Sequence, residues 1–190
     1  ADEIISDIHK HGVNIMPFDY RQDHRRCSVK DGAILYGIPL IKSCSQAVAD
    51  QVYYASGMQL SHFWRLLKHL YDNGVNTAQM TILIRLGFFS SFGNEQALMR
   101  IDRLYEMFYG KKQIDKKRVD NSPIGELVKK HSTDIGKSGN ILKRWNLLDG
   151  DALMGDIETE CLSNTNTEFT FKEKADYQKE VLGFVSLMTG

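Results

Sequence analysis

Apolar residues recur three or four positions apart through most of the chain, which is the spacing of one helix face. Glycines end these runs, and residues that favour helix N-termini begin them. The pattern predicts a mainly α-helical fold with helices over residues 2–10, 44–56, 63–73, 77–86, 94–109, 124–130 and 171–188, and a brief amphipathic piece at 141–148.

Short-range signals mark the ends of several elements. Ser43 with Gln46, and Asn76 with Gln79, match the capping box, in which side chains and backbone N–H groups bond reciprocally at a helix start. Asp31-Gly32 lies between two short apolar runs, which predicts a small β-hairpin over residues 27–36. We expect no other strands. Residues 149–167 end in a Ser, Thr and Asn run typical of a loop.

Charge is unevenly distributed although the formal net charge is zero. Residues 1–148 hold 21 Lys and Arg against 15 Asp and Glu, whereas residues 149–190 hold 3 against 9. The basic part contains two clusters that would suit a polyanion, because each neutralised phosphate releases counterions. The alternative is a solvated surface. The clusters are Arg21, Arg25, Arg26 and Lys30, and Lys111, Lys112, Lys116, Lys117 and Arg118.

The sequence contains no recognisable catalytic motif. Phosphate-loop, dinucleotide, zinc-protease and nucleophile-elbow patterns are all missing, and the basic part has no carboxylate cluster for two-metal chemistry. Asp149, Asp151 and Asp156 fit a solvated acidic loop. We therefore expect no catalytic residue, metal or cofactor, and no activity from this chain alone. Three separated cysteines, with neither a membrane span nor a signal peptide, predict a cytoplasmic protein.

Two helix–tight turn–helix units are the most informative pattern. In the first, residues 34–41 lead through 42–45 into a capped helix; in the second, 77–86 lead through 87–93 into the helix over 94–109. Such a turn exposes backbone N–H groups at a helix N-terminus, where the helix dipole favours a phosphate oxygen. A helical hairpin used only for packing is the alternative interpretation.

Four segments, in order along the chain, resemble the tandem helix-hairpin-helix region of the bacterial replicative DNA polymerase III alpha subunit. They are GVNIMPFD (12–19), ILYGIPLIK (34–42), LIRLGFFSSFGN (83–94) and YQKEVLGF (177–184). The resemblance implies a helix-hairpin-helix domain over residues 1–110, a polar connector with short helices over 111–170, and a helix over 171–190 leading to a further domain. Because the chain starts with Ala and ends on apolar residues, we expect a piece of a larger polymerase.

By this resemblance, the chain would bind duplex DNA without reading its sequence. The remainder of the polymerase chain would be its partner, and the sliding clamp would bind through that parent chain. The implied phosphate-binding residues are Lys42, Ser43, Ser45 and Gln46 at the first hairpin and Gly93 and Asn94 at the second. Electrostatic support would come from Arg21, Arg25, Arg26, Lys111, Lys112, Lys116, Lys117 and Arg118.

The sequence also departs from the family pattern. Ser43 and Ser45 replace two glycines of the first hairpin, and Glu95 stands where the family favours Arg and would repel a phosphate. These departures favour a rival hypothesis, in which the domain is a scaffold or protein-interaction module that has lost DNA contact. Residues 59–63 resemble a clamp-binding peptide, but Phe63 also fits the core of the next helix.

Overall fold

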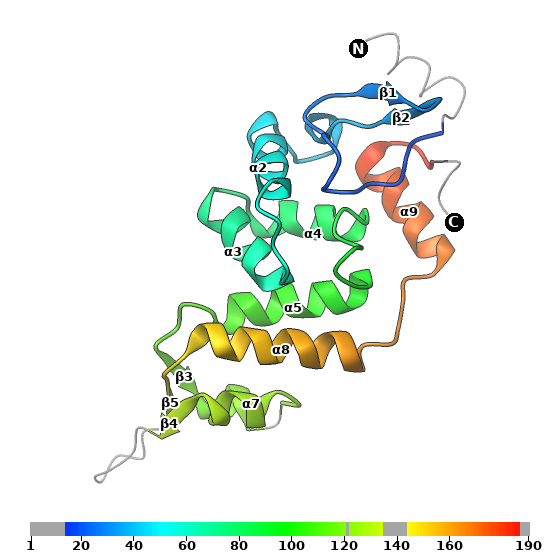
Figure 1. Ribbon diagram of the computed structural model, residues 1–190. Helices are drawn as coiled ribbons and strands as arrows, with labels where there is room; N and C mark the ends of the chain where they lie inside the picture. Colours follow the sequence, from blue (N-terminus) through cyan, green and yellow to red (C-terminus); the bar gives the residue numbers. More distant parts are fainter. Residues whose placement is uncertain (1–13, 121, 135–143, 187–190) are drawn as a thin grey trace. The chain divides into compact units, whose positions relative to one another are not determined.

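The computed structural model describes residues 14–120, 122–134 and 144–186 (Figure 1). Over these residues the chain is mainly helical, as predicted, and it divides into two units. Unit 1 comprises Ala1–Met99 and Thr167–Gly190, and unit 2 comprises Arg100–Asn166. The predicted helix over residues 2–10 lies outside the described residues.

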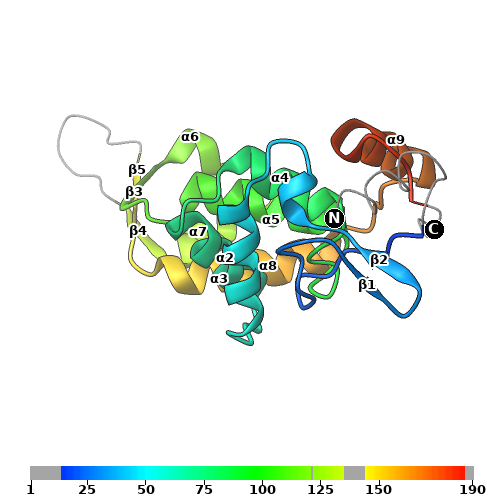
Figure 2. The same ribbon diagram turned by 90° about the horizontal axis from the view of Figure 1, so that it is seen from above.

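The predicted β-hairpin is present in unit 1. Strands β1 (Ser28–Lys30) and β2 (Ala33–Leu35) pair antiparallel, and they lie side by side in Figure 2. Asp31 and Gly32 form the turn with φ angles of 51° and 78°. Positive φ at both positions is the geometry whose twist matches the flanking strands, and Asp-Gly tolerates it well.

The rest of unit 1 is helical. Its elements are η1 (Ile38–Leu40), α2 (Gln46–Ser56), α3 (Phe63–Asp72), α4 (Thr77–Arg85), the start of α5 (Glu95–Phe108) and α9 (Phe171–Leu182). The core is centred on α3 and α4, where Phe63, Leu67, Leu70, Met80 and Leu83 are completely buried. Each such side chain contributes about 1.5–3 kcal/mol relative to exposure, so these two helices hold the unit together.

The start of the first hairpin unit differs from the prediction. Residues 34–41 form the end of β2 and the short 3-10 helix η1, not a longer helix. Gly37 lies between them, and a Cβ there would come within 3.0 Å of the Arg26 carbonyl carbon and the Cys27 nitrogen. The chain turns against its own backbone at this point, which prevents a continuous helix.

The two predicted capping boxes had different outcomes. At α4 the prediction is confirmed: the Gln79 N–H donates to Asn76 Oδ1 at 2.8 Å, and the Asn76 N–H donates to Gln79 Oε1 at 3.0 Å. At α2 it is wrong, because Ser45 is the N-cap and its Oγ accepts from the Val48 N–H at 3.4 Å. Ser43 has φ of 65° and lies within the turn.

Helix α9 is shorter than predicted and groups with unit 1. Thr170 and Glu173 form a capping box at its start, and Gly183, with φ of 85°, ends it six residues earlier than the sequence suggested. α9 packs against α4. Helix α9 is therefore part of the packing of unit 1, and the further domain to which it would lead stays a prediction.

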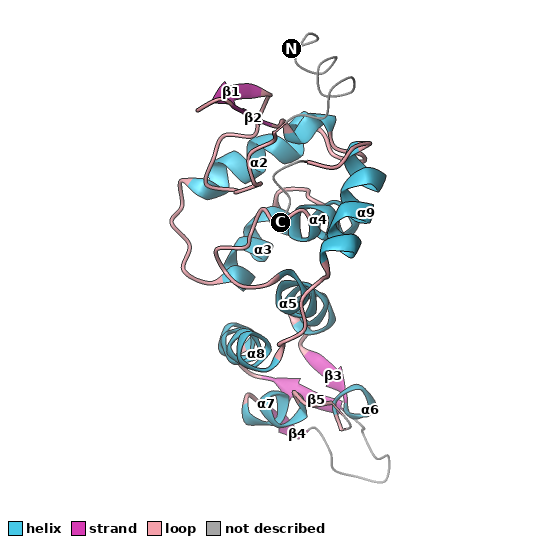
Figure 3. Cartoon of the chain, turned by 90° about the vertical axis from the view of Figure 1, so that its right-hand side faces the viewer, coloured by secondary structure: helices cyan, strands magenta, loops and turns pink. Residues whose placement is uncertain are grey.

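Residues 111–170 are more ordered than the expected connector. Strands β3 (Gln113–Asp115), β5 (Arg144–Leu147) and β4 (Ser132–Asp134) form an antiparallel sheet in that order (Figure 3). Helices α6 (Lys116–Val119), α7 (Gly125–Lys130) and α8 (Gly150–Asn164) complete unit 2. Expecting no strands outside the first hairpin was therefore wrong. β3 pairs with β5 across about 30 positions, and even β4 and β5 pair residues more than ten positions apart, so neither pairing is a tight turn that a short window reveals.

Helix α8 also contradicts the predicted acidic loop. Asp149 caps it, with Oδ1 accepting from the Ala152 N–H at 3.0 Å, and Leu153, Ile157 and Cys161 are buried along one face. Asp156 is not simply solvated, since its carboxylate lies 2.7 Å from His131 Nε2 and 3.0 Å from Lys130 Nζ. These contacts attach α8 to the end of α7 within unit 2.

Candidate nucleic-acid interface

The first tight turn, residues 41–45, is called hairpin 1 and connects η1 to α2. The Cys44 N–H donates to the Ile41 carbonyl oxygen at 3.0 Å, which closes the turn. The four residues predicted to contact phosphate here are all exposed: Lys42, Ser43, Ser45 and Gln46. Hairpin 1 therefore presents the whole predicted set at the surface.

The start of α2 supplies donors beside hairpin 1. Gln46 and Ala47 are its first two residues, and amides in the first turn of a helix have no acceptor within that helix. Both residues are exposed, and neither backbone N–H makes a hydrogen bond with another residue in the described ranges. The positive end of the α2 dipole and the exposed Lys42 side chain add favourable potential for an anion.

Gln79 connects hairpin 1 to the start of α4. Its Nε2 donates to the Ser43 carbonyl oxygen at 3.0 Å, while its Oε1 accepts from the Asn76 N–H. One side chain thus caps α4 and holds the turn residue with positive φ. The N-terminus of α4 is consequently placed next to hairpin 1, a role for Gln79 that the sequence analysis did not assign.

The hairpin 1 cysteine does not oppose an anion. Burial raises the pKa of the Cys44 thiol to about 11, so the group is neutral at physiological pH. All three cysteines of the chain are free.

The second tight turn, residues 87–93, is called hairpin 2 and connects α4 to α5. Phe88 and Phe89 anchor it: the Phe88 ring stacks on Phe18 with centroids 4.7 Å apart, and Phe89 lies 5.7 Å from Phe63. Of the predicted phosphate contacts, Gly93 and Asn94 are both half-buried. Asn94 Oδ1 accepts from the Ala97 N–H at 2.8 Å, so this side chain caps α5.

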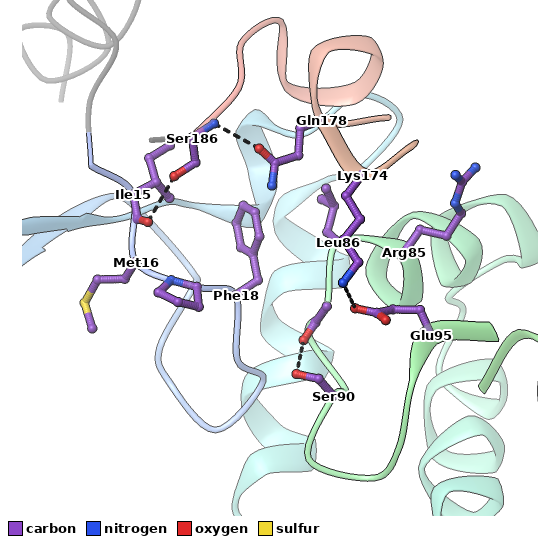
Figure 4. Close-up of a pocket in the computed structure, with 12 residues that line it drawn as sticks. Ile15, Met16, Phe18, Arg85, Leu86, Ser90, Glu95, Lys174, Gln178 and Ser186 are labelled. Atoms are coloured by element: carbon purple, nitrogen blue, oxygen red, sulfur yellow. Dashed lines mark hydrogen bonds and ion pairs between the residues drawn. The ribbon is translucent and has the colours of Figure 1, made fainter. Parts of the chain in front are cut away.

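Glu95 turns toward a cavity beside hairpin 2. The cavity has a volume of about 250 Å³ and is bordered by the Pro17 segment, hairpin 2 and α9 (Figure 4). The Glu95 carboxylate approaches Lys174 of α9 at 4.0 Å, and its side chain is only 14% exposed. The expected repulsion of a phosphate is therefore reduced by this cation, while the cavity gains no net positive charge from the pair.

Helix α9 contacts hairpin 1 and the end of α4. At hairpin 1, the Lys42 N–H donates to the Val181 carbonyl oxygen at 3.0 Å. Next to hairpin 2, the Arg85 guanidinium lies over Tyr177 at 3.8 Å and over Phe169 at 4.5 Å, which are cation–π distances. The Lys42 amide is thus already used within the protein, and only the side chain of this residue remains for a ligand.

Several predicted electrostatic residues are neutralised by neighbouring carboxylates. Arg21 binds Asp19 at 2.7 Å and Arg25 binds Asp23 at 2.8 Å, and each hydrogen bond lowers the pKa of its carboxyl group. Arg25 also lies 3.6 Å from the centre of the Tyr53 ring. Lys116 pairs with Asp134 at 2.7 Å. These three cations therefore add less to the potential than the sequence suggested.

The other members of the predicted electrostatic set are exposed. Their side chains make no hydrogen bond or ion pair with any residue in the described ranges: these are Arg26, Lys111, Lys112, Lys117 and Arg118. Arg26 belongs to unit 1 and the other four belong to unit 2. Arg144, which no motif singled out, joins the unit 2 cations because β5 pairs with β3 and places it opposite Asp115.

Other features of the described residues bear on the remaining expectations. Phe63 is 0% exposed, which favours a core role over an exposed clamp-binding peptide for residues 59–63. Within the described ranges, no group of three or more His, Cys, Asp or Glu side chains is placed to hold a metal ion. Helices in those ranges are too short or too polar to cross a membrane.

Comparison with protein families bears on the same part of the chain. A family model described as a helix-hairpin-helix motif matches residues 12–99, a range that contains both hairpins. A comparison with curated proteins gave no significant match. Residues 12–99 therefore carry a helix-hairpin-helix motif, which is associated with nucleic-acid binding in general.

Proposed function

We propose that this chain binds the sugar-phosphate backbone of duplex DNA without reading its sequence, and that hairpin 1 is the principal contact. The observation that carries this proposal is the set of exposed groups around hairpin 1, inside the matched motif. The backbone N–H groups of Gln46 and Ala47 and the Lys42 ammonium can all bind a phosphate oxygen. Contacts of this kind do not distinguish one base sequence from another.

The biological setting we propose is DNA replication in the cytoplasm, as a non-catalytic part of a polymerase III alpha subunit. The support is the ordered series of four segments that resemble that family. In this setting the chain needs no cofactor and catalyses nothing itself. The remainder of the polymerase is its covalent partner, and the sliding clamp binds elsewhere on that parent.

A second candidate is a scaffold that holds polymerase domains or a replisome protein. Hairpin 2 favours it, because aromatic packing anchors that turn and Glu95 places a carboxylate at the start of α5. Hairpin 1 favours DNA binding, since its predicted contacts are exposed. The two candidates differ in what a charge reversal at hairpin 1 should do.

The test is fluorescence anisotropy of the full chain with labelled duplex and single-stranded DNA at low and moderate salt. DNA binding predicts a duplex preference and an affinity that falls as salt rises. Lys42→Glu should weaken duplex binding at least about tenfold, because it removes one phosphate contact and adds a repulsive charge. Lys68→Glu on α3 is the control, and it should change affinity by less than about threefold.

Two results would reject the DNA-binding proposal. One is the absence of binding to either DNA at low salt by a chain that melts cooperatively. The other is equal weakening by Lys42→Glu and Lys68→Glu, which would indicate only a diffuse effect of net charge. Either result would favour the scaffold candidate.

A further inference from the structure

A second cavity, within unit 2, is lined by cations from three places in the chain. It has a volume of about 230 Å³, and Lys111, Arg118 and Arg144 contribute to its wall. Lys111 precedes β3, Arg118 lies in α6, and Arg144 is the first residue of β5. Pairing of β3 with β5, with Asp115 opposite Arg144, brings these separate positions to one cavity, called here the basic pocket.

The Arg144 side chain is held in place on the wall of the basic pocket. Its Nη1 donates to Gln113 Oε1 at 3.3 Å, and its Nε lies 3.3 Å from Asp115 Oδ1. Asp115 also lines the pocket, so the local balance is three cations against one carboxylate. A guanidinium fixed by two neighbours loses little conformational freedom when it binds a ligand.

The other two cations have no charge partner among the described residues. The Lys111 and Arg118 side chains are exposed, and neither makes a hydrogen bond or ion pair with a residue in the described ranges. Like charges gathered around one cavity repel each other, and an anion between them would convert this repulsion into attraction. The excess charge and the concave shape together favour a compact, multiply charged anion.

We propose that the basic pocket binds a phosphate group of a nucleic-acid backbone, as a contact separate from hairpin 1. The phosphate chemistry follows from the pocket itself, whereas its nucleic-acid source rests on the proposed function. Arg118 and Arg144 offer planar donor sets that suit phosphate oxygens, and Lys111 adds a third positive charge.

The neighbouring lysines provide matched controls for this proposal. Lys112 follows Lys111, and Lys117 precedes Arg118; both are exposed, and neither lines the pocket. A diffuse basic surface would be weakened equally by neutralising either member of a pair. A localised site would be weakened more by Lys111→Gln than by Lys112→Gln, and more by Arg118→Gln than by Lys117→Gln.

The first experiment titrates the 190-residue chain with inorganic phosphate and follows its backbone amides by NMR. The expected result is a saturable shift at Gln113 and Ile114, lost in the double variant Lys111→Gln/Arg118→Gln and retained in Lys112→Gln/Lys117→Gln. Lys42→Glu should also retain it, because hairpin 1 is a separate site. No saturable shift, or equal loss in both double variants, would overturn the pocket. Overlaid spectra of the unliganded variants verify that each one folds.

The second experiment measures duplex binding of the same variants by anisotropy. Each pocket variant should weaken binding roughly three- to tenfold more than its neighbouring control. Saturable phosphate binding with equal effects on DNA across each pair would overturn the nucleic-acid source and leave a site for free phosphate. If the wild-type chain bound phosphate here but no DNA at all, the proposed function would fail separately from the pocket.

Discussion

Ser43 and Ser45 have different roles in hairpin 1. Ser43 takes a left-handed backbone conformation with φ of 65°, which costs a residue with a side chain more than it costs glycine. Ser45 has φ of −141° and needs no glycine, and its hydroxyl caps α2. Ser43 therefore holds a backbone conformation that suits glycine, whereas Ser45 caps α2.

Ser43→Gly should stabilise the chain by about 0.5 kcal/mol. The gain from relieving the left-handed strain exceeds the entropy that glycine adds to the unfolded state. The same change removes a Cβ from hairpin 1 and should strengthen DNA binding. Thermal denaturation and anisotropy check both effects. Ser45→Gly is the comparison: it should cost a few tenths of a kcal/mol, since glycine is a weaker cap. A destabilised Ser43→Gly variant would contradict the assigned strain.

His24 is a buried titratable group between hairpin 2 and the β-hairpin. It is 2% exposed, its Nδ1 lies 2.8 Å from the Tyr36 carbonyl oxygen, and its ring contacts Phe88. Burial lowers its pKa below the usual value, because the charged imidazolium loses its hydration. The folded chain therefore favours the neutral ring.

Stability should fall as the pH is lowered from 7 toward 5, and His24 should account for part of this fall. The unfolded chain takes up the proton first, near pH 6.5, so the contribution is present above that pH and is lost as pH falls toward the folded pKa. Urea denaturation at several pH values measures this, with His24→Gln as the comparison. If the free energy of unfolding depended on pH in the same way in that variant, the contribution assigned to His24 would be contradicted. The contribution of Asp156, whose pKa His131 and Lys130 lower, is present above about pH 4 and is lost only below that pH, outside this range.

Among the elements, α9 has the most connections to the candidate interface. It accepts the Lys42 N–H at hairpin 1, places the Tyr177 ring against the Arg85 guanidinium, and places Lys174 next to Glu95. An isolated twelve-residue helix is marginal in water, so these contacts and its buried residues stabilise α9 in return. Helix α9 therefore supports hairpin 1 and the residues on either side of hairpin 2.

Gly125→Ala should destabilise unit 2 by about 2 kcal/mol, whereas Gly155→Ala should stabilise it by about 0.5–1 kcal/mol. A Cβ at Gly125, the first residue of α7, would overlap the Val119 carbonyl oxygen at the end of α6. A Cβ at Gly155, inside α8, would meet nothing within 4 Å and would favour the helix. Chemical denaturation of both variants measures the effects. Equal effects would contradict the close packing of α6 and α7.

Across the whole molecule, the sequence predicted what local chemistry determines. The α4 capping box, the Asp-Gly turn and the buried faces of α3 and α4 depend on residues within one or two turns of each other, and all are present. The sheet of unit 2 was missed because it joins Gln113 to Asn146, a pairing that no short window contains. Helix α8 was missed although Leu153, Ile157 and Cys161 have helical spacing, because the acidic residues around them suggested a loop.

The candidate interface was predictable only in part. Hairpin 1 and its exposed residues follow from the motif, but ion pairing does not. The pairs of Arg21 with Asp19 and Arg25 with Asp23 depend on side-chain geometry in an irregular loop. Arg144 enters the basic pocket only through strand pairing. Counting charges along the sequence therefore overestimates the positive potential of the cluster that contains Arg21 and Arg25. It also omits Arg144 from the second cluster.

The most direct test of the account is amide chemical-shift mapping of the full chain titrated with a short DNA duplex of mixed sequence. The account predicts the largest unit 1 shifts at Ser43, Gln46 and Ala47, with smaller shifts at the start of α5. It also predicts the same pattern for a second duplex of unrelated sequence, because the contacts are to phosphates. Shifts confined to α5, or no shift at hairpin 1 at low salt, would contradict the claim that hairpin 1 holds the nucleic-acid backbone.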